Sequence, residues 1–408
     1  MAVVDSDGGA ARRVCILGST GSVGKSTIDL IERRPDAYKV VSLVARQNVE
    51  LLAEQAKRLK PELAVIAEPD GYGALRDALA GSGVEVAAGA DAVIAAASLQ
   101  ADWTMAAIVG AAGLAPTIAA VRQGGVVAFA NKECLVCAGS LLMREVAKSG
   151  ATLLPVDSEH NAIFQVFDFD RVDRIEKIIL TASGGPFRSF AKADMEFVSP
   201  AQAVAHPNWS MGAKISVDSA TMMNKGLEII EASYLFPVGE ERIEVVVHPQ
   251  SVIHSMVAYC DGSILAQLGS PDMRTPIAFT LGWPDRIDAP VSRLDFASLS
   301  ELTFEPPDEE RFPALALARR ALQSGGSAPT ILNAANEVAV QSFLMEKLGF
   351  LDIARVVEAT LAAVPHTPVG QLDDVYDVDD QARRVAGDLI ASMTGTVATV
   401  GTLDRTGT

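Results

Sequence analysis

Short apolar runs alternate with helical patterns over the first 156 residues of the chain. The runs are rich in Val, Ile, Leu and Ala, as is typical of strands that are buried on both faces of a parallel sheet. They lie at residues 14–17, 40–44, 63–66, 103–109, 126–130 and 152–156. Strands and helices that alternate in this way predict an α/β fold with a doubly wound, Rossmann-type parallel sheet, which we assign to residues 14–156.

Beyond this sheet the pattern changes. Further strand-like runs lie at residues 175–181, 244–248, 252–257 and 263–267. They predict a second sheet in a central α+β catalytic domain at 157–283. A proline-bearing, charged stretch at 284–313 is expected to be a linker, and helical periodicity at 314–393 predicts a C-terminal helical bundle. Residues 1–13 and 394–408 are expected to be disordered tails.

Composition narrows the classes of function. The net charge of −17 argues against nucleic acid as the main partner, because phosphate backbones require a basic footprint. No apolar run reaches the roughly 18 residues that a membrane span needs. The N-terminus lacks the apolar core of a secretory signal, and Asp5 and Asp7 argue against a transit peptide, so we expect a cytoplasmic protein.

The four cysteines include one CxxC pair, Cys134 and Cys137. A zinc ribbon needs a second such pair, and the sequence has none. A redox role stays open as an alternative. We favour buried, reduced thiols, because both cysteines lie in an apolar segment.

A glycine-rich turn follows the first apolar run and precedes a helical pattern. Its spacing is Gly18-x-x-Gly21-x-x-Gly24, a variant of the dinucleotide-binding pattern. A phosphate-binding Walker A loop is excluded, because Ser19 occupies the position of its first glycine. The turn therefore predicts a nucleotide whose phosphates face a helix N-terminus, and a turn with no ligand is the alternative.

The end of the second predicted strand carries Arg46, Gln47 and Asn48. Enzymes that use NAD usually have an acidic residue there, about 20 residues beyond the glycines, which binds the ribose hydroxyls. A cation with two amides suits a 2′-phosphate instead, so the sequence favours NADPH over NADH. An arginine exposed on the surface without a ligand is the alternative.

Carboxylates follow the last strand of the first predicted sheet. Asp157 and Glu159 come directly after it, and Glu228 lies in a later helical segment that also carries Asn224 and Lys225. Helical spacing places Asn224 and Glu228 on one face. Hard oxygen ligands of this kind suit Mg²⁺ or Mn²⁺, with Co²⁺ as a further candidate. A solvated acidic surface is the alternative. Thr221 is expected to cap the helix that carries Asn224, Lys225 and Glu228, and this helix is expected to run through Ser233.

The loop at 206–212 carries Trp209 and Met211 between polar residues. We expect it to be a lid that excludes water once substrate is bound, and a packed loop is the alternative. His206 and His254 are candidates for orienting substrate. His160 directly follows the carboxylates, but a role in packing is enough to explain a histidine at this position.

Several longer motifs resemble the 1-deoxy-D-xylulose 5-phosphate reductoisomerase family over about residues 13–392. They are GSTGSVG (18–24), ANKE (130–133), LPVDSEHNAIFQ (154–165), SGGPF (183–187), HPNWSMG (206–212), KISVDSATMMNKGLE (214–228), HPQSVIH (248–254) and PDMRT (271–275). The resemblance implies NADPH-dependent, metal-dependent conversion of a small phosphorylated ketose to 2-C-methyl-D-erythritol 4-phosphate, in non-mevalonate isoprenoid synthesis. It also implies a homodimer.

The resemblance further implies a role for each matching residue. Contacts with NADPH are implied for Thr20, Gly21, Ser22, Val23, Arg46, Gln47, Asn48, Asn131, Glu133 and Gly212. The metal ligands would be Asp157, Glu159 and Glu228. Substrate contacts are implied for Lys132, Ser158, Glu159, Ser183, His206, Ser219, Asn224, Lys225 and Glu228. Lys132 and the three metal ligands would be the catalytic residues.

Two small departures from the family pattern are visible: Cys134 stands where serine is common, and Ala182 where glycine is common. Neither argues against activity.

The sequence leaves open whether the carbon skeleton rearranges by a concerted ketol shift or by retro-aldol cleavage and re-addition. Alternative functions are a metal-assisted NADP oxidoreductase for another phosphorylated sugar and a non-catalytic nucleotide-binding protein.

Overall fold

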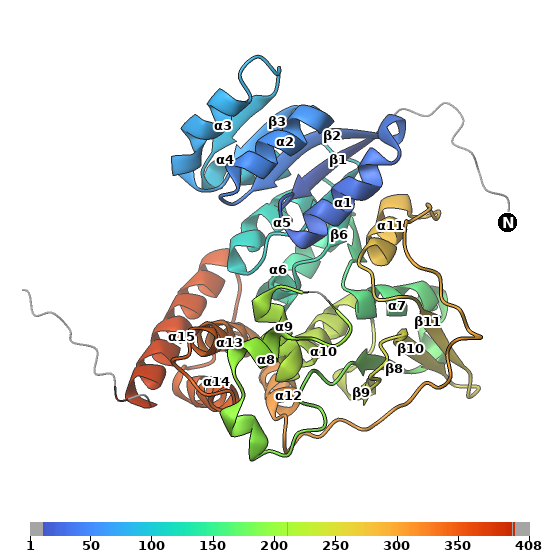
Figure 1. Cartoon of the computed structure of the whole chain (residues 1–408), viewed down its shortest axis with the longest axis vertical. Helices are drawn as coiled ribbons and strands as arrows, with labels where there is room; N and C mark the ends of the chain where they lie inside the picture. The colour runs from blue at the N-terminus through green and yellow to red at the C-terminus, as the bar shows by residue number, and fades with distance from the viewer. Residues whose placement is uncertain (1–10, 210, 394, 396–408) are drawn as a thin grey trace, which may run out of the picture. The chain divides into compact units, whose positions relative to one another are not determined.

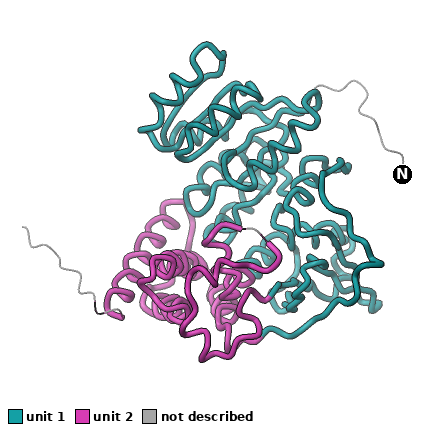
Figure 2. Tube along the Cα trace, in the orientation of Figure 1, with its two compact units in different colours: residues 1–183, 227–307 teal, residues 184–226, 308–408 magenta. Residues whose placement is uncertain are grey.

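The computed structural model describes residues 11–209, 211–393 and 395 of the chain. The chain divides into two compact units, which Figure 2 colours separately. Unit 1 comprises residues 1–183 and 227–307, and unit 2 comprises residues 184–226 and 308–408. The three-domain division expected from the sequence stays a prediction. The expected tails fall mostly outside the described residues, and so does Ser210 of the expected lid loop.

Unit 1 contains a seven-stranded sheet in which every neighbouring pair is parallel. Its strands are β1 (Arg12–Leu17), β2 (Tyr38–Ala45), β3 (Leu63–Ile66), β4 (Glu85–Ala88), β5 (Trp103–Ala106), β6 (Val126–Phe129) and β7 (Thr152–Pro155). They are arranged in the order β4-β3-β2-β1-β5-β6-β7. Figure 1 labels β1, β2, β3 and β6 of this sheet. The doubly wound parallel sheet expected from the apolar runs is confirmed.

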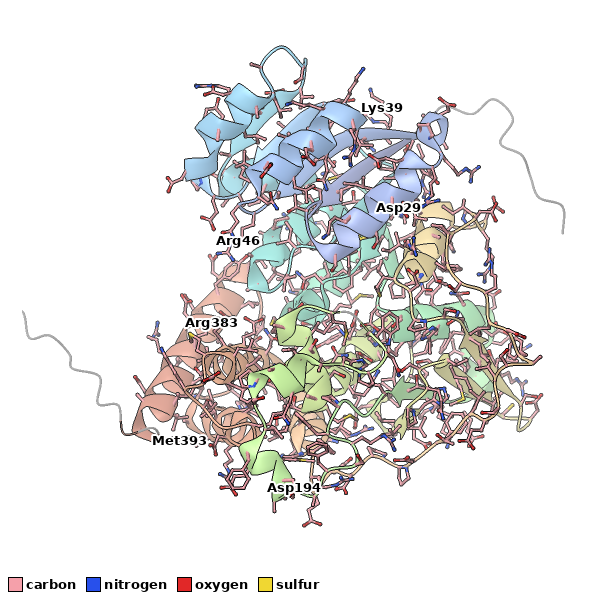
Figure 3. All side chains as sticks on the ribbon, in the orientation of Figure 1. Asp29, Lys39, Arg46, Asp194, Arg383 and Met393 are labelled. Atoms are coloured by element: carbon pink, nitrogen blue, oxygen red, sulfur yellow. The ribbon has the colours of Figure 1, made fainter. Side chains whose placement is uncertain are left out.

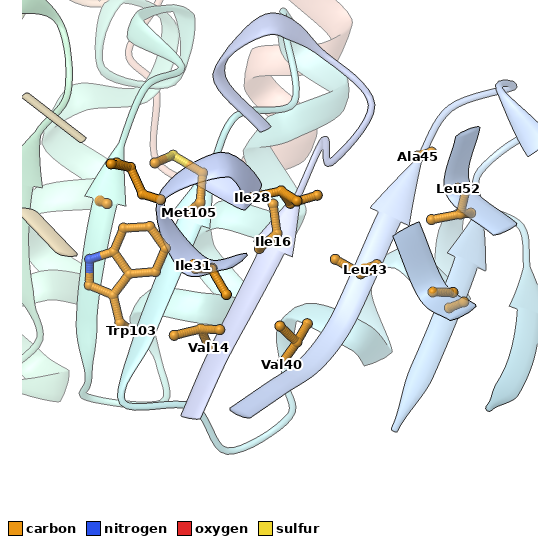
Figure 4. Packing of buried hydrophobic residues seen from close by; sticks show 14 of the residues in the cluster. Val14, Ile16, Ile28, Ile31, Val40, Leu43, Ala45, Leu52, Trp103 and Met105 are labelled. Atoms are coloured by element: carbon orange, nitrogen blue, oxygen red, sulfur yellow. The ribbon is translucent and has the colours of Figure 1, made fainter. Parts of the chain in front are cut away.

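Helices connect these strands and cover the sheet. They are α1 (Ser22–Glu32), α2 (Val49–Leu59), α3 (Tyr72–Ala78), α4 (Ala90–Ala97), α5 (Leu114–Val121) and α6 (Lys132–Ser149), with short 3-10 turns η1 (Pro35–Ala37), η2 (Pro69–Gly71) and η3 (Ala111–Gly113). Val14 and Ile16 of β1 pack with Ile28 of α1 in a buried cluster (Figure 4). Cys15, between them, contacts the carbonyl of Ala96 in α4. Successive residues of β1 therefore face different helical layers.

The strand order creates a switch point beside β1. From β1 the chain proceeds outward through β2, β3 and β4 and then returns to β5 on the other side of β1. Connections that leave neighbouring strands in opposite directions open a crevice at the carboxyl ends of those strands, where doubly wound sheets bind ligands. The glycine turn at 18–24 lies at this edge, directly after β1.

A smaller sheet in the same unit has the order β11-β10-β8-β9. Its strands are β8 (Ile175–Ala182), β9 (Ile243–Val247), β10 (Ile253–Tyr259) and β11 (Ile264–Leu268). Only the β8–β9 pair is parallel. The neighbouring elements are α7 (Ser158–Val166), η4 (Phe169–Arg174), η6 (Glu240–Arg242) and α11 (Arg274–Gly282). Helix α7 contacts β10 and β11. The expected second sheet is thus confirmed.

Unit 2 is helical in the part of it that the structure describes. Its elements are η5 (Asp194–Phe197), α8 (Pro200–Val204), α9 (Ala213–Ala220), α12 (Ala314–Ser324), α13 (Ala328–Leu344), α14 (Asp352–Ala363) and α15 (Leu372–Met393). Ile331 and Ala334 of α13 form a buried cluster with Val378 and Ala382 of α15. The C-terminal helical bundle is confirmed, and its last helix, α15, begins at Leu372. Helix α10 (Met223–Leu235) begins in unit 2 and continues into unit 1.

Within the described residues, no helix has both the length and the apolar character that crossing a membrane requires.

Candidate active site

Three carboxylates from two helices converge in unit 1. Asp157 caps the N-terminus of α7, where its side chain accepts a hydrogen bond from the backbone N–H of Glu159 at 3.2 Å. Glu228 lies in the second turn of α10 and is completely buried. One carboxylate oxygen from each of Asp157, Glu159 and Glu228 lies within 4.8 Å of the others. Three hard anionic ligands at this spacing fit a divalent cation, so the predicted residues are brought together as the metal hypothesis requires.

Lys132, the first residue of α6, brings a positive charge to this cluster. Its Nζ lies 2.6 Å from Oδ2 of Asp157 and 3.4 Å from Oε1 of Glu228. Burial alone would lower the pKa of Lys132, but the nearby carboxylates outweigh burial and raise that pKa well above its usual value. The side chain is therefore a charged donor held at the cluster.

The sequence interpretation underestimated His160, which lies against the carboxylate cluster. Its ring is completely buried, and Nε2 lies 2.9 Å from the carbonyl oxygen of Glu228. Nδ1 lies 3.1 Å from Oε2 of Glu231 and 3.5 Å from Oδ1 of Asp157. The Nε2 nitrogen can donate to the Glu228 carbonyl, and Nδ1 lies within ion-pair distance of Glu231, so the surroundings favour an imidazolium. Burial opposes this charge, but Glu231 above all raises the pKa of His160, to about 9.

Glu231 was missed altogether, although the sequence contains a signal for it. Asp157 and His160 are three residues apart on α7, and Glu228 and Glu231 are three apart on α10. Residues at this spacing lie on the same face of a helix. Each helix therefore supplies a candidate metal ligand and, one turn later, one member of a buried ion pair. Partners of this kind fix the orientation of metal ligands.

The glycine turn has the close packing that a dinucleotide site needs. Gly18 has φ of +92°, and a Cβ added there would lie 2.5 Å from the carbonyl oxygen of Ala107. A Cβ at Gly24 would overlap the backbone of the turn itself. Only glycine fits both positions, and α1 consequently starts directly at the turn, with Gly21 as its N-cap. The first backbone N–H groups of α1, among them those of Ser22 and Val23, are available for an anion.

Two buried polar atoms near this crevice have no hydrogen-bond partner among the described residues: Oγ of Ser19 and Oδ1 of Asn131. Asn131, after β6, uses its amide nitrogen on the carbonyls of Ile108 and Gly110 in the loop after β5. Glu133, two residues on, is also buried. Unsatisfied buried polar atoms are uncommon in proteins, and a polar ligand at the switch point would satisfy these, so the crevice fits NADPH.

Arg46, Gln47 and Asn48 follow β2, which pairs with β1. All three are exposed, and Arg46, labelled in Figure 3, has 80% of its side chain accessible. Its Nε lies 3.0 Å from Oε1 of Glu68, whereas the Asn48 side chain caps α2. The guanidinium is thus at the same sheet edge as the glycine turn and open to a ligand.

The remaining predicted residues are distributed over both units. Ser158 begins α7, and its hydroxyl donates to Oε2 of Glu159 at 2.5 Å. Ser183 directly follows β8. In unit 2, His206 follows α8, Gly212 is the N-cap of α9, Ser219 lies within α9, and Asn224 and Lys225 are at the start of α10. The position of these unit 2 residues relative to the carboxylates stays a prediction.

The helix expected from Thr221 to Ser233 differs in its beginning. Thr221 is the C-cap of α9, and Met222 adopts a left-handed conformation with φ of +64° before α10 starts at Met223. The Thr221 hydroxyl accepts a hydrogen bond from the backbone N–H of Met223 at 3.3 Å. Ser219 therefore belongs to a separate helix from Asn224, a break that helical periodicity did not reveal.

His206 has a defined tautomer in its loop. Its Nδ1 accepts hydrogen bonds from the backbone N–H groups of Asn208 at 3.2 Å and Trp209 at 3.0 Å. In the neutral ring the proton is therefore on Nε2, which makes this nitrogen a donor.

Comparison with known proteins agrees with this geometry. Models of 1-deoxy-D-xylulose 5-phosphate reductoisomerase and its C-terminal domain match residues 14–139 and 153–236, and a model of the DXP reductoisomerase C-terminal domain matches residues 268–385. The chain is 64% identical over 388 residues to 1-deoxy-D-xylulose 5-phosphate reductoisomerase of Rhodospirillum centenum, covering 95% of this chain and 96% of the relative. The chain belongs to the 1-deoxy-D-xylulose 5-phosphate reductoisomerase family.

Solved structures of the reductoisomerase family have the same fold. The enzyme from Zymomonas mobilis in complex with NADPH is 57% identical, with a TM-score of 0.90, and the match covers 94% of this chain and all of that one. A reductoisomerase in complex with NADPH, fosmidomycin and magnesium is 43% identical, also with a TM-score of 0.90, over 94% of this chain and 99% of that one.

Proposed function

We propose that this chain converts 1-deoxy-D-xylulose 5-phosphate to 2-C-methyl-D-erythritol 4-phosphate, with NADPH and a divalent cation, in non-mevalonate isoprenoid synthesis. The observation that carries the proposal is the convergence of Asp157, Glu159 and Glu228 around the Lys132 ammonium in a member of this family. Relatives bound to NADPH and magnesium support the choice of cofactors. The favoured metal is Mg²⁺ or Mn²⁺, with Co²⁺ as a further candidate.

Each residue then has a definite task. Asp157, Glu159 and Glu228 would hold the cation, which when bound supplies Lewis-acid polarisation of the substrate carbonyl, while NADPH supplies the hydride. Lys132 stabilises developing oxyanion charge by hydrogen bonding and can deliver a proton. The His160 imidazolium would orient the Asp157 carboxylate from behind, and through the backbone carbonyl of Glu228 it would hold the turn of α10 that carries the Glu228 side chain.

Binding of the small, flexible substrate would depend on its phosphate. We assign the phosphate to Ser183, Ser219, Asn224 and Lys225, and further substrate contacts to Ser158 and His206. The loop at 206–212 would close over the substrate and exclude water through Trp209 and Met211. A fixed phosphate would convert binding energy into orientation of the reacting carbons, which either route of skeletal rearrangement requires.

The cofactor would lie along the carboxyl edge of the large sheet. Its phosphates would face the N-terminus of α1 at Thr20, Gly21, Ser22 and Val23, and its 2′-phosphate would pair with Arg46, next to Gln47 and Asn48. Contacts with the rest of the cofactor are assigned to Asn131, Glu133 and Gly212.

The test is NADPH oxidation followed at 340 nm with purified protein. Turnover is expected only when 1-deoxy-D-xylulose 5-phosphate and Mg²⁺ or Mn²⁺ are both present. Ribulose 5-phosphate and xylulose 5-phosphate serve as controls for the alternative sugar-phosphate oxidoreductase. Equal turnover of a control sugar would contradict the assigned substrate, and turnover unaffected by EDTA would contradict the metal.

We also propose a homodimer in the cytoplasm. Strand β11 is at the edge of the smaller sheet, with Ile264 and Leu265 about half exposed, and such an edge can pair with a second copy. Cysteines 15, 134, 137 and 260 form no disulfide, as expected in a reducing compartment. Sedimentation equilibrium should give twice the monomer mass of 42.9 kDa, and a monomer at micromolar concentration would refute the dimer.

A further inference from the structure

A second pocket lies entirely within unit 2 and contains none of the residues proposed above. It is partly open, with a volume of about 220 Å³. Its lining comes from α12, α14, the segments that precede these helices, Lys192 and Thr221. Pockets for drug-sized ligands are larger, so this volume suits a small metabolite.

The floor and the rim of this pocket differ in chemistry. The floor contains the buried side chains of Phe312, Leu317 and Phe350. The rim carries the exposed cations Lys192, Arg320 and Arg355, together with one exposed carboxylate, Glu358. An apolar floor below a ring of cations fits a ligand with a hydrocarbon body and an anionic head.

The rim cations are only partly neutralised. Arg320 pairs with Glu358 at 2.7 Å, and both side chains are about 60% exposed. Arg355 pairs with Asp352 at 2.7 Å and is 68% exposed. Nζ of Lys192 donates to the carbonyl of Glu310, and no carboxylate of the described residues pairs with it. Exposed ion pairs contribute little to stability, so an incoming anion can replace them at small cost.

A fourth cation gives the pocket a fixed frame. Arg311 donates through Nε to Asp308 at 2.7 Å and through Nη1 to the carbonyls of Arg188 and Phe190, at 2.9 and 2.7 Å. Its guanidinium lies 5.5 Å from the ring centroid of Phe312. These contacts hold Arg311 in place, so the pocket wall is formed before any ligand arrives.

We propose that this pocket is a second anion-binding site, which takes a small organic phosphate with a short apolar body. Guanidinium groups match phosphate in geometry and retain their charge at any physiological pH. A cationic cluster in a chain with net charge −17 also concentrates anions locally against the field of the whole protein. The apolar floor distinguishes an organic phosphate from inorganic phosphate.

Binding can be measured directly with n-butyl phosphate and the full chain by isothermal titration calorimetry. The double variant R320Q/R355Q should bind at this site about tenfold more weakly or not at all, because charge-assisted hydrogen bonds are lost. The matched control is R76Q/R122Q, which removes two arginines that are similarly exposed and ion-paired, with side chains 61% and 60% accessible. Thermal melting verifies that both variants remain folded.

Three further measurements sharpen the result. Glu358→Gln removes the anion that competes for Arg320, so it should tighten binding several-fold. Inorganic phosphate should bind about tenfold more weakly than n-butyl phosphate, because it leaves the apolar floor unfilled. Butyltrimethylammonium, a cation with the same hydrocarbon body, should not bind.

A phosphate bound at the proposed substrate site contributes equally to the parent and to both double variants, so only the difference between R320Q/R355Q and R76Q/R122Q tests this pocket. Equal binding by these two variants, or unchanged binding by Glu358→Gln, would overturn the proposal. Failure of the proposed reaction appears separately, in the NADPH-oxidation assay.

Discussion

The two halves of the proposed active site in unit 1 are built by opposite means. The carboxylate cluster consists of charged side chains that are partly or completely buried: Asp157 and Glu159 are partly buried, whereas Glu228 and His160 are completely inaccessible. The nucleotide crevice consists of backbone geometry at Gly18 and Gly24 with exposed side chains such as Arg46 around it.

This difference follows from the ligands. A small cation with two positive charges is bound by a few oxygens at fixed distances, so the chain must bury and orient those oxygens in advance. A dinucleotide is long and largely hydrated, and it is recognised by close approach to backbone N–H groups and by charges at its ends. We therefore expect substitutions in the cluster to affect catalysis and substitutions in the crevice to affect stability or cofactor choice.

The largest effect is expected for Glu228→Gln. Loss of one ligand charge should reduce kcat by about 10²–10³-fold or more, since electrostatic groups of this kind are the main catalytic contributors. Affinity for NADPH, measured by fluorescence titration, should stay unchanged. Glu241→Gln, an exposed carboxylate, is the control. Near-normal turnover by Glu228→Gln would refute the metal role of this residue.

Gly18→Ala should destabilise the crevice, since φ of +92° and the clash with the Ala107 carbonyl both oppose a Cβ. We expect a loss of about 2–4 kcal/mol in the free energy of unfolding, measured by urea denaturation. Gly81→Ala is the matched control, because Gly81 also has positive φ, +76°, but no atom within 4 Å of an added Cβ. It should lose only about 1 kcal/mol. Equal losses would mean that the clash is relieved without cost.

Glu231→Gln tests the ion pair behind the metal ligands. Without its charged partner His160 should orient Asp157 and Glu228 less firmly, so the Mn²⁺ concentration for half-maximal activity should rise about 10–100-fold. Glu145→Gln is the control, because Glu145 pairs with Arg122 at 2.6 Å on the surface. A lower melting temperature with an unchanged Mn²⁺ requirement would show a purely structural role for Glu231.

Arg46→Asp is expected to weaken NADPH binding about tenfold or more, because a charge-assisted hydrogen bond to the 2′-phosphate is lost. NADH binding should hardly change. Arg76→Asp, at an exposed ion pair in the same unit, is the control. If both cofactors were weakened equally, the 2′-phosphate assignment would be wrong.

The smallest effect concerns Cys15, which is buried within β1. Burial raises the pKa of its thiol to about 12. The thiol ionises near pH 9 when the chain is unfolded. The contribution of the buried, protonated thiol to the free energy of unfolding is therefore complete below pH 9 and is lost between about pH 9 and 12.

At pH 8, iodoacetamide should label exposed Cys260 quickly and Cys15, Cys134 and Cys137 slowly. Rapid labelling of Cys134 or Cys137 would revive the redox interpretation of that pair.

The apolar runs were sufficient to predict six strands of the large sheet and the four strands of the second, because an element that is buried on a given face needs a matching local pattern. The edge strand β4 was not predicted, since its residues are only partly buried. Local pattern also failed at Met222, where a left-handed residue separates α9 from α10 although both sides are helical.

The sequence by itself determined the order of the elements, the need for glycine after β1 and the kinds of side chain that follow each strand. These properties depend on neighbouring residues along the chain, so they leave a pattern in it. Only the tertiary structure decided that His160 lies between Glu228 and Glu231, that Lys132 reaches Asp157, and that Arg320 and Arg355 stand above the same buried phenylalanines. Helical spacing shows which of these side chains share a face, but the partner across the interface is chosen by packing between segments that are distant in the chain, and local sequence does not record that packing.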